Sequence, residues 1–222
     1  TGQSRAVTLA EVGLDRIIYD LIGGVWPGTG GTCGVEILGG ASCTISVGFT
    51  PNNLGLLADT IEVKYFDGVS DQTTPRNIQG TGVIPANLEI SDGDPYDYGT
   101  LIVGQPVNKL FTITNTGGML GTAMAITGLA APLNFSGGTY PGLGGNCLAA
   151  LAPAASCTIE VAYTPVAAGV HNLTMNLGYN NGVIVTATTK DLQGSAVTPA
   201  FLTISDGATY DFGIQATGSV TN

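Results

Sequence analysis

The feature that most constrains the fold is a stretch that occurs twice in the chain. Its first copy, residues 23–51, reads GGVWPGTGGTCGVEILGGASCTISVGFTP, and its second, residues 137–165, reads GGTYPGLGGNCLAALAPAASCTIEVAYTP. Each copy has a Gly/Pro-rich loop, two cysteines, and an alternating segment that ends in aromatic-Thr-Pro. The spacing of Cys33 and Cys147 predicts a repeated unit of 114 residues.

Composition favours a packed protein made of strands and turns. Of the 222 residues, 44% are hydrophobic and only 10% are charged, so the chain lacks the composition of a disordered protein. Its 34 glycines, together with abundant Thr, Val and Ile, favour short strands over helices. The net charge of −10 excludes nucleic acid as a partner. No apolar run approaches the ~20 residues of a membrane span, so we expect no membrane insertion in this segment.

Alternation of apolar and polar residues predicts the strands. From Cys43 to Phe49, every second side chain is apolar or cysteine, which is typical of a half-buried strand. Turn residues separate many such segments, and this spacing predicts an antiparallel, immunoglobulin-like β-sandwich. Two strands are predicted within residues 1–22, and another ends near residue 82. The remaining strands are predicted at 60–66, 87–90, 96–103, 110–114, 123–129, 133–136, 157–163, 172–179 and 183–192.

The repeat also fixes the expected domains. Residues 202–213 match 88–99 at the same offset. We therefore expect tandem immunoglobulin-like sandwiches, with an incomplete unit at 1–84 that lacks its first strands and a complete unit at 85–198. Residues 199–222 hold the first strands of a third unit. Those strands are candidates to complete the 1–84 unit of a neighbouring molecule.

A set of motifs gives the chain a family resemblance. The motifs are Tyr-Asp-aromatic-Gly followed by Val-Gly, Phe-Thr-Ile-Thr-Asn-Thr-Gly, Ser-Cys-Thr-Ile, aromatic-Thr-Pro, and a glycine at Gly80 or Gly194. Together they resemble the choice-of-anchor D repeats of bacterial surface proteins, which are related to ASH (Hydin-type) immunoglobulin-like domains. The resemblance implies a secreted or surface-attached bacterial protein. It implies no enzymatic activity and no particular ligand, because a fold does not fix a function.

The four cysteines could form disulfides, bind zinc or remain free thiols. Pairing Cys33 with Cys43 and Cys147 with Cys157 is the simplest of the three connectivities that four cysteines allow. Such bonds would stabilise each loop by about 2–3 kcal/mol and indicate an oxidising compartment. A zinc site needs four ligands, which neither unit offers, and free thiols are the remaining alternative. We expect disulfides, no metal and no cofactor.

Two other groups are candidate ligands or catalytic residues. Asp92, Asp94 and Asp97 could hold calcium, yet Ala208 stands where the repeat would place a second copy of Asp94. Turn formation explains these aspartates better. His171 is the sole histidine and lies in a predicted strand, so we expect a structural role rather than a place in a catalytic triad.

Trp26 and Tyr140 occupy corresponding loop positions, each followed by Pro-Gly. Exposed loop aromatics can contact glycans or proteins, although aromatics at such positions more often pack over the end of a sandwich. We keep both residues as possible loop contacts.

These observations predict a non-enzymatic extracellular or cell-surface protein. The expected function is a stalk, fibre or filament of disulfide-stapled beads, and the expected partners are other copies of the chain, bound head to tail, or further repeats of the same chain. The alternative is an adhesin or ligand-binding module that recognises a glycan or protein through its loops. A chain cut from a longer tandem array and a natural subunit that exchanges strands both fit the pattern.

Overall fold

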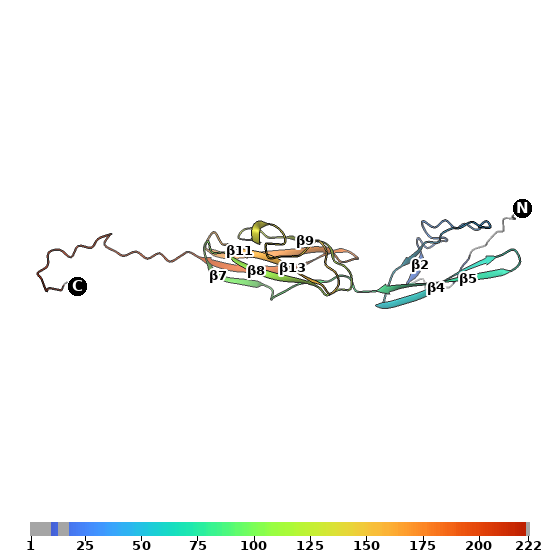
Figure 1. The fold of residues 1–222 in the computed structure, drawn as a ribbon, viewed down its shortest axis with the longest axis horizontal. Helices are drawn as coiled ribbons and strands as arrows, with labels where there is room; N and C mark the ends of the chain where they lie inside the picture. The colour runs from blue at the N-terminus through green and yellow to red at the C-terminus, as the bar shows by residue number, and fades with distance from the viewer. Residues whose placement is uncertain (1–9, 13–17, 221–222) are drawn as a thin grey trace.

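The computed structural model describes residues 10–12 and 18–220. Figure 1 shows three parts in a row: a small group of strands on the N-terminal side, a β-sandwich in the middle, and an extended C-terminal segment. The regular structure is almost entirely strand, and the one helical element in the described part is a short 3₁₀ turn at Ser136–Gly138. The predicted all-β, immunoglobulin-like class is confirmed.

The sandwich consists of two four-stranded sheets. The first has the order β10-β11-β8-β6 and the second the order β7-β13-β12-β9. Neighbouring strands are antiparallel except for β7 and β13, which run parallel. The strands are β6 (Leu88–Ile90), β7 (Tyr96–Ile102), β8 (Val107–Asn115), β9 (Thr122–Thr127), β10 (Leu133–Phe135), β11 (Ser156–Tyr163), β12 (Gly169–Asn180) and β13 (Val185–Val197).

The core of the sandwich comes from the inward residues of both sheets. Strand β11 buries every second side chain, as its alternating sequence predicts, and β8 does the same. These inward residues pack against those of β12 and β13 in one continuous cluster. Its fully buried members include Phe111, Ile113, Ile159, Val161, Met175, Leu177 and Leu192.

A tyrosine closes one end of this core. Tyr163 is fully buried and lies across Gly194 of β13, where an added Cβ would come within 2.7 Å of the tyrosine ring. Glycine is therefore required at this point of the strand because the ring occupies the space of a side chain. The Tyr163 hydroxyl is 2.7 Å from Nδ1 of His171, and the Tyr98 ring lies 5.5 Å away.

The N-terminal group contains two smaller sheets. In one, β1 (Ala10–Val12), β4 (Gly55–Phe66) and β5 (Asp71–Gly82) are paired in that order. In the other, β2 (Tyr19–Leu21) pairs with β3 (Val47–Phe49). Residues 1–9 and 13–17, which carry parts of two predicted strands, lie outside the described residues.

One predicted strand of this group is too long. We expected a strand from Cys43 to Phe49, and the structure forms it only as β3, Val47–Phe49. The counterpart β11 is paired along its whole length with β8 and only over its last residues with β10. In the part of the chain that the structure describes, β3 pairs with β2 alone, so only the corresponding short stretch is held as a strand.

The C-terminal segment differs from the sequence prediction. We expected the first strands of a further unit in residues 199–222, and residues 199–220 form no strand. A strand needs a hydrogen-bonding neighbour, and this segment extends away from the sandwich (Figure 1). Its apolar side chains are consequently in solvent: Leu202 is 93% exposed, whereas the matching Leu88 of β6 is 1% exposed.

Replacing a core residue tests the sandwich directly. We expect Phe111→Ala to lower the free energy of unfolding of the sandwich by about 3–5 kcal/mol, because Phe111 is fully buried. The adjacent Leu110→Ala should cost far less, since Leu110 points outward and is exposed. Urea unfolding followed by tyrosine fluorescence measures both, and equal losses would contradict this assignment of the core.

Candidate interaction surfaces

The two cysteine loops are closed by disulfides. Cys147 is joined to Cys157 and Cys33 to Cys43, with Cα–Cα distances of 4.9 and 4.8 Å. The described part contains no free cysteine. The Cys147–Cys157 bond ties its loop to the start of β11, and the Asn146 side chain accepts a hydrogen bond from the Thr158 backbone nitrogen at 2.7 Å. Each loop is therefore fastened to the strand that follows it.

The loop aromatics Trp26 and Tyr140 each donate a hydrogen bond to the backbone of a disulfide loop. The Tyr140 hydroxyl donates a hydrogen bond to the Leu148 carbonyl at 3.1 Å, and Trp26 Nε1 donates to the Gly34 carbonyl at 3.4 Å. Each carbonyl belongs to the residue directly after the first cysteine of its loop. Both aromatics are half-buried, and burial raises the pKa of Tyr140. The structure gives them a packing role, and contact with a ligand stays a prediction.

The acidic junction is built around a carboxylate held by a lysine. Lys109 Nζ lies 2.9 Å from Asp92 Oδ1 and 5.0 Å from the centre of the Tyr96 ring. Two hydrogen bonds hold the pKa of Asp92 below its ordinary value, and the bond from Lys109 contributes more than the bond from Ser91. The Lys109–Asp92 bond also raises the pKa of Lys109. Lys190, only 2% exposed, donates to the backbone carbonyl of Asp92 at 2.7 Å.

The other two aspartates of the junction are occupied by turns and strand contacts. Asp94 accepts a hydrogen bond from the Asp191 backbone nitrogen at 2.8 Å. Asp97 accepts bonds from the Gly99 nitrogen and the Gln193 side chain at 2.7 and 3.1 Å. No cluster of three or more His, Cys, Asp or Glu side chains in the described residues could hold a metal ion. The carboxylates thus fasten the β6–β7 connection to β13.

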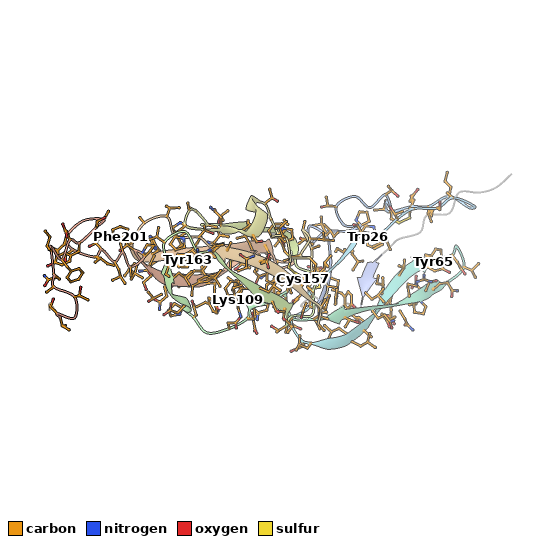
Figure 2. All side chains as sticks on the ribbon, turned by 60° about the vertical axis from the view of Figure 1, so that its left-hand side comes forward. Trp26, Tyr65, Lys109, Cys157, Tyr163 and Phe201 are labelled. Carbon is orange, nitrogen blue, oxygen red and sulfur yellow. A yellow bond between two sulfur atoms is a disulfide. The ribbon has the colours of Figure 1, made fainter. Side chains whose placement is uncertain are left out.

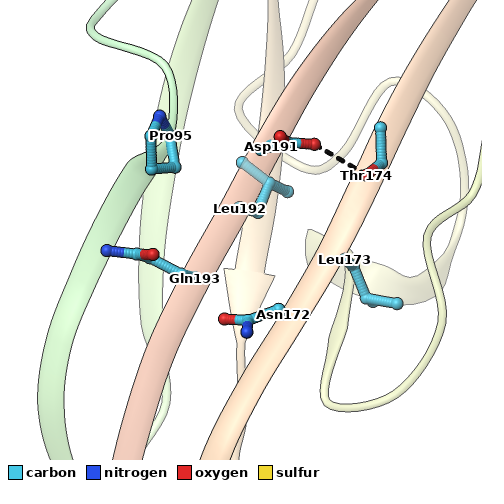
Figure 3. Close-up of a pocket in the computed structure, with 7 residues that line it drawn as sticks. All are labelled: Pro95, Asn172, Leu173, Thr174, Asp191, Leu192 and Gln193. Atoms are coloured by element: carbon cyan, nitrogen blue, oxygen red, sulfur yellow. Dashed lines mark hydrogen bonds between the residues drawn. The ribbon is translucent and has the colours of Figure 1, made fainter.

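An open polar hollow that the sequence did not predict lies over the β12–β13 pair (Figure 3). Thr174 Oγ1 donates to Asp191 Oδ1 at 2.6 Å across it, and Pro95 closes one side. A matching hollow lies over β4 and β5, where Thr60 donates to Asn77 at 3.0 Å. The second hollow has no counterpart of Pro95, because no β6–β7 connection accompanies β5 in the described residues.

The two groups of strands differ in how well their sheets are covered. On the N-terminal side, the edge of β5 and the face that carries Phe49 lack the cover that the sandwich provides. Phe49 lies across Gly80 as Tyr163 lies across Gly194, yet Phe49 is 36% exposed and Tyr163 is fully buried. Among the described residues, strand β5 pairs only with β4, whereas β13 has β7 on its other side. Exposed apolar groups therefore occur at both ends of the molecule, around β5 and in residues 199–220, and Figure 2 shows the side chains of the latter segment, with Phe201 labelled.

Comparison with known proteins gives no family assignment from sequence. No family model matches the chain, and no curated protein sequence matches it. Solved structures similar to it include the VesB protease of Vibrio cholerae, at 21% identity and a TM-score of 0.41, over 49% of this chain and 31% of VesB. An ASH/PapD-like domain of human CEP192 matches at 13% identity and a TM-score of 0.40, over 52% of this chain and 89% of that domain.

A second protease corrects one expectation. The secreted serine protease VesC of Vibrio cholerae matches at 12% identity and a TM-score of 0.36, over 66% of this chain and 36% of VesC. The exclusion of enzymes from the sequence alone was therefore wrong, because two of the similar structures are proteases. This chain spans about a third of the length of either protease, and similarity at this level concerns the fold and assigns no activity.

The fold and the cysteine chemistry define the class of protein. The chain is an all-β, immunoglobulin-like protein with two intrachain disulfides. Disulfides of this structural kind form outside the reducing cytoplasm, so the chain is a secreted type of protein. Within the described residues, no helix has the length and apolar character needed to cross a membrane.

Acidification tests the Asp92–Lys109 pair. The lowered pKa of Asp92 means that its charged form stabilises the fold at pH values above the unfolded-state pKa, about 3.9, and that this contribution is lost as the pH falls through the folded-state pKa. Unfolding midpoints in urea from pH 6 down to about 2 should fall less steeply in Asp92→Asn than in the wild type. High salt should reduce the difference in pH dependence between the wild type and Asp92→Asn. Parallel curves would contradict the pairing.

Removing one disulfide tests the role of the loops. The double variant Cys147→Ser, Cys157→Ser should lower the free energy of unfolding by about 2–3 kcal/mol, because the bond no longer restrains the unfolded chain. Tyr140→Phe, which loses only one hydrogen bond in the same loop, should cost about 1 kcal/mol. Chemical unfolding of both variants gives the comparison, and an unchanged stability in the cysteine variant would show that the bond is dispensable.

Proposed function

We propose that this chain is an extracellular structural segment of a bacterial surface protein of the choice-of-anchor D kind, in which disulfide-stapled immunoglobulin-like units are joined end to end as a stalk, fibre or filament. The main support is a correspondence of strand pairing. Met175 faces Lys190 across β12 and β13, and Ile61 faces Arg76 across β4 and β5, 114 residues earlier. Strands β1, β4 and β5 also follow the order of β9, β12 and β13.

The junction between the two units supports a stiff assembly. Strand β5 ends at Gly82 and β6 begins at Leu88. Within this short connection, Ala86 donates to the Asn181 carbonyl at 2.9 Å, and the Ile84 carbonyl accepts a bond from Gly118 at 3.1 Å. Backbone hydrogen bonds on both sides fix the connection against the sandwich, so the units are not joined by a loose tether.

The packing of Gly117 supports the same conclusion. A Cβ at this position would overlap the Pro85 carbonyl and the backbone of Ala86. Glycine therefore lets the connection lie directly on the β8–β9 turn. A connection held this closely favours a fixed angle between units over a hinge.

A second candidate function is adhesion through the disulfide loops. The loops carry exposed apolar side chains, among them Val35 and Leu38 in the first and Leu148 in the second. Apolar groups that are displayed on a stapled loop suit recognition of a glycan or protein surface. Binding to a glycan or extracellular-matrix array that is lost in both Leu148→Asp and Leu38→Asp would favour this function.

Solution scattering tests the stalk proposal. At low concentration, the full chain should give the profile of an elongated particle with a narrow cross-section. A variant with Gly-Ser-Gly-Ser inserted after Ile84 should give a broader range of lengths, because the insertion frees the connection from Asn181 and Gly118. A compact wild-type particle, or identical profiles for the two proteins, would contradict the proposal.

A further inference from the structure

We propose that residues 202–216 of one molecule add to the free edge of β5 in a second copy of this chain, reproducing between molecules the parallel pair that β7 and β13 form within the sandwich. The inference rests on the proposed function and names the partner that continues the fibre: a second copy, bound head to tail. The donor segment lies at one end of the molecule and the acceptor edge at the other (Figure 1).

The acceptor is a sandwich without the cover that its counterpart has. Ile78 of β5 is only half-buried, whereas its counterpart Leu192 is fully buried beneath β7 and the facing sheet. Strand β7 is the edge strand of its sheet and pairs with β13 alone. Addition of a β7-like strand to β5 therefore needs no strand other than β5, and an open edge of this kind readily accepts one.

At two positions the donor has the backbone conformation of the β6–β7 region. Asp206 has φ 71° and the matching Asp92 has φ 69°, both in the left-handed region that residues other than glycine seldom adopt. Gly213 and Gly99 have φ 68° and 76°. The segment thus keeps these two local conformations of a docked strand without a partner strand.

Side-chain contacts within the donor match as well. The Asp211 carboxylate accepts a bond from the Gly213 nitrogen at 2.8 Å, as Asp97 does from Gly99 at 2.7 Å. The rings of Tyr210 and its neighbour Phe212 meet edge to face at 4.8 Å, and the corresponding tyrosine pair of β7 meets at 5.0 Å. A segment that is preformed in this way loses less conformational freedom on binding than a flexible one does.

The repeat fixes the register of the intermolecular pair. Within the sandwich, Leu192 is opposite Tyr96 and Gln193 is opposite Asp97. The 114-residue offset then places Tyr210 opposite Ile78 and Asp211 opposite Gln79. In this register Phe212 takes the place of Tyr98 and comes against Phe49, as Tyr98 lies against Tyr163. Phe212 is 61% exposed without its partner, so docking buries two uncovered rings together.

Polar contacts of the β7–β13 pair have counterparts across the same intermolecular pair. In the sandwich, Lys190 donates to the Asp92 carbonyl, and Gln193 donates to the Asp97 carboxylate. The counterparts are Arg76 facing the Asp206 backbone carbonyl and Gln79 facing the Asp211 carboxylate. The donor segment has two carboxylates and no basic residue, so the positive partner has to come from the acceptor.

The pairing cannot form within one molecule. Residues 198–209 connect β13 to the donor strand and span at most about 43 Å when fully extended. The thirteen residues of β13 alone run about 43 Å, and β5 lies beyond the far end of that strand (Figure 1). The acceptor must therefore belong to another molecule.

The experiment is sedimentation velocity of the full chain over a wide concentration range. The average mass of the wild type should rise with concentration. Phe212→Asp should need about 30-fold higher concentration to reach the same mass, because it places a charge at the apolar centre of the contact. The matched control is Ser219→Asp, which adds the same charge outside the donor segment and should leave assembly unchanged. Both residues lie outside the folded sandwich, so neither change should alter its thermal unfolding.

A change of the acceptor's basic residue tests the register. Arg76→Met should weaken assembly, because it removes the side chain that would donate to the Asp206 carbonyl, and Arg76→Lys should keep it, since a lysine makes this bond in the sandwich. A peptide of residues 199–222 in excess should cap the acceptor and lower the mass of the wild type, and the same peptide with Phe212→Asp should not. A mass that stays that of one chain at every concentration, or equal effects of Phe212→Asp and Ser219→Asp, would overturn the proposal.

Failure of this inference and failure of the proposed function give different results. A rod-shaped particle that never assembles overturns strand donation and leaves a stalk of covalently joined units. The opposite result is also possible: the variants change assembly as expected, but the single particle scatters as a compact body. That result upholds strand donation and overturns the stalk.

Discussion

The structure depends on covering the inner faces of its sheets, and the aromatic residue that ends the strand after each disulfide shows this most clearly. Tyr163 reaches across the core to Gly194 and is sealed by Tyr98 and the facing sheet. Phe49 makes the same reach to Gly80 but stays partly in solvent. The difference arises from the neighbouring strands and not from the residue itself, because a ring is buried only when strands lie on both sides of it.

Much of this architecture could be predicted from alternation and spacing. The inward positions of β8 and β11, with Phe111 and Ile159 at the centre, follow from the period of two, which fixes the face of every side chain. The parallel pairing of β7 with β13 could not be predicted, since alternation does not identify a strand's neighbour. The same limit explains why the predicted strand from Cys43 proved too long: its length depends on a partner strand elsewhere in the chain.

The candidate site was harder to predict than the fold. The sequence identified the cysteines, but it gave no sign that Lys190 would be buried against the Asp92 carbonyl, since an isolated lysine ordinarily points to solvent. Nor could it show the polar hollow of Thr174 and Asp191, which arises from two strands brought together by tertiary pairing. Its exclusion of enzymes failed for a related reason: the lack of a visible triad in one segment does not limit which proteins share its fold.

The direction of β7 has a mechanical consequence. In the proposed string, a unit would be entered through β6 and β7 and left through β13, and β7 and β13 run parallel as neighbours in one sheet. Tension on such a string would therefore pull the start of β7 and the end of β13 in opposite directions along the strands. The hydrogen bonds between them are loaded together, in shear, and do not open one after another as they would in a hairpin pulled apart from its end. Resistance to force is thus concentrated along a single strand pair.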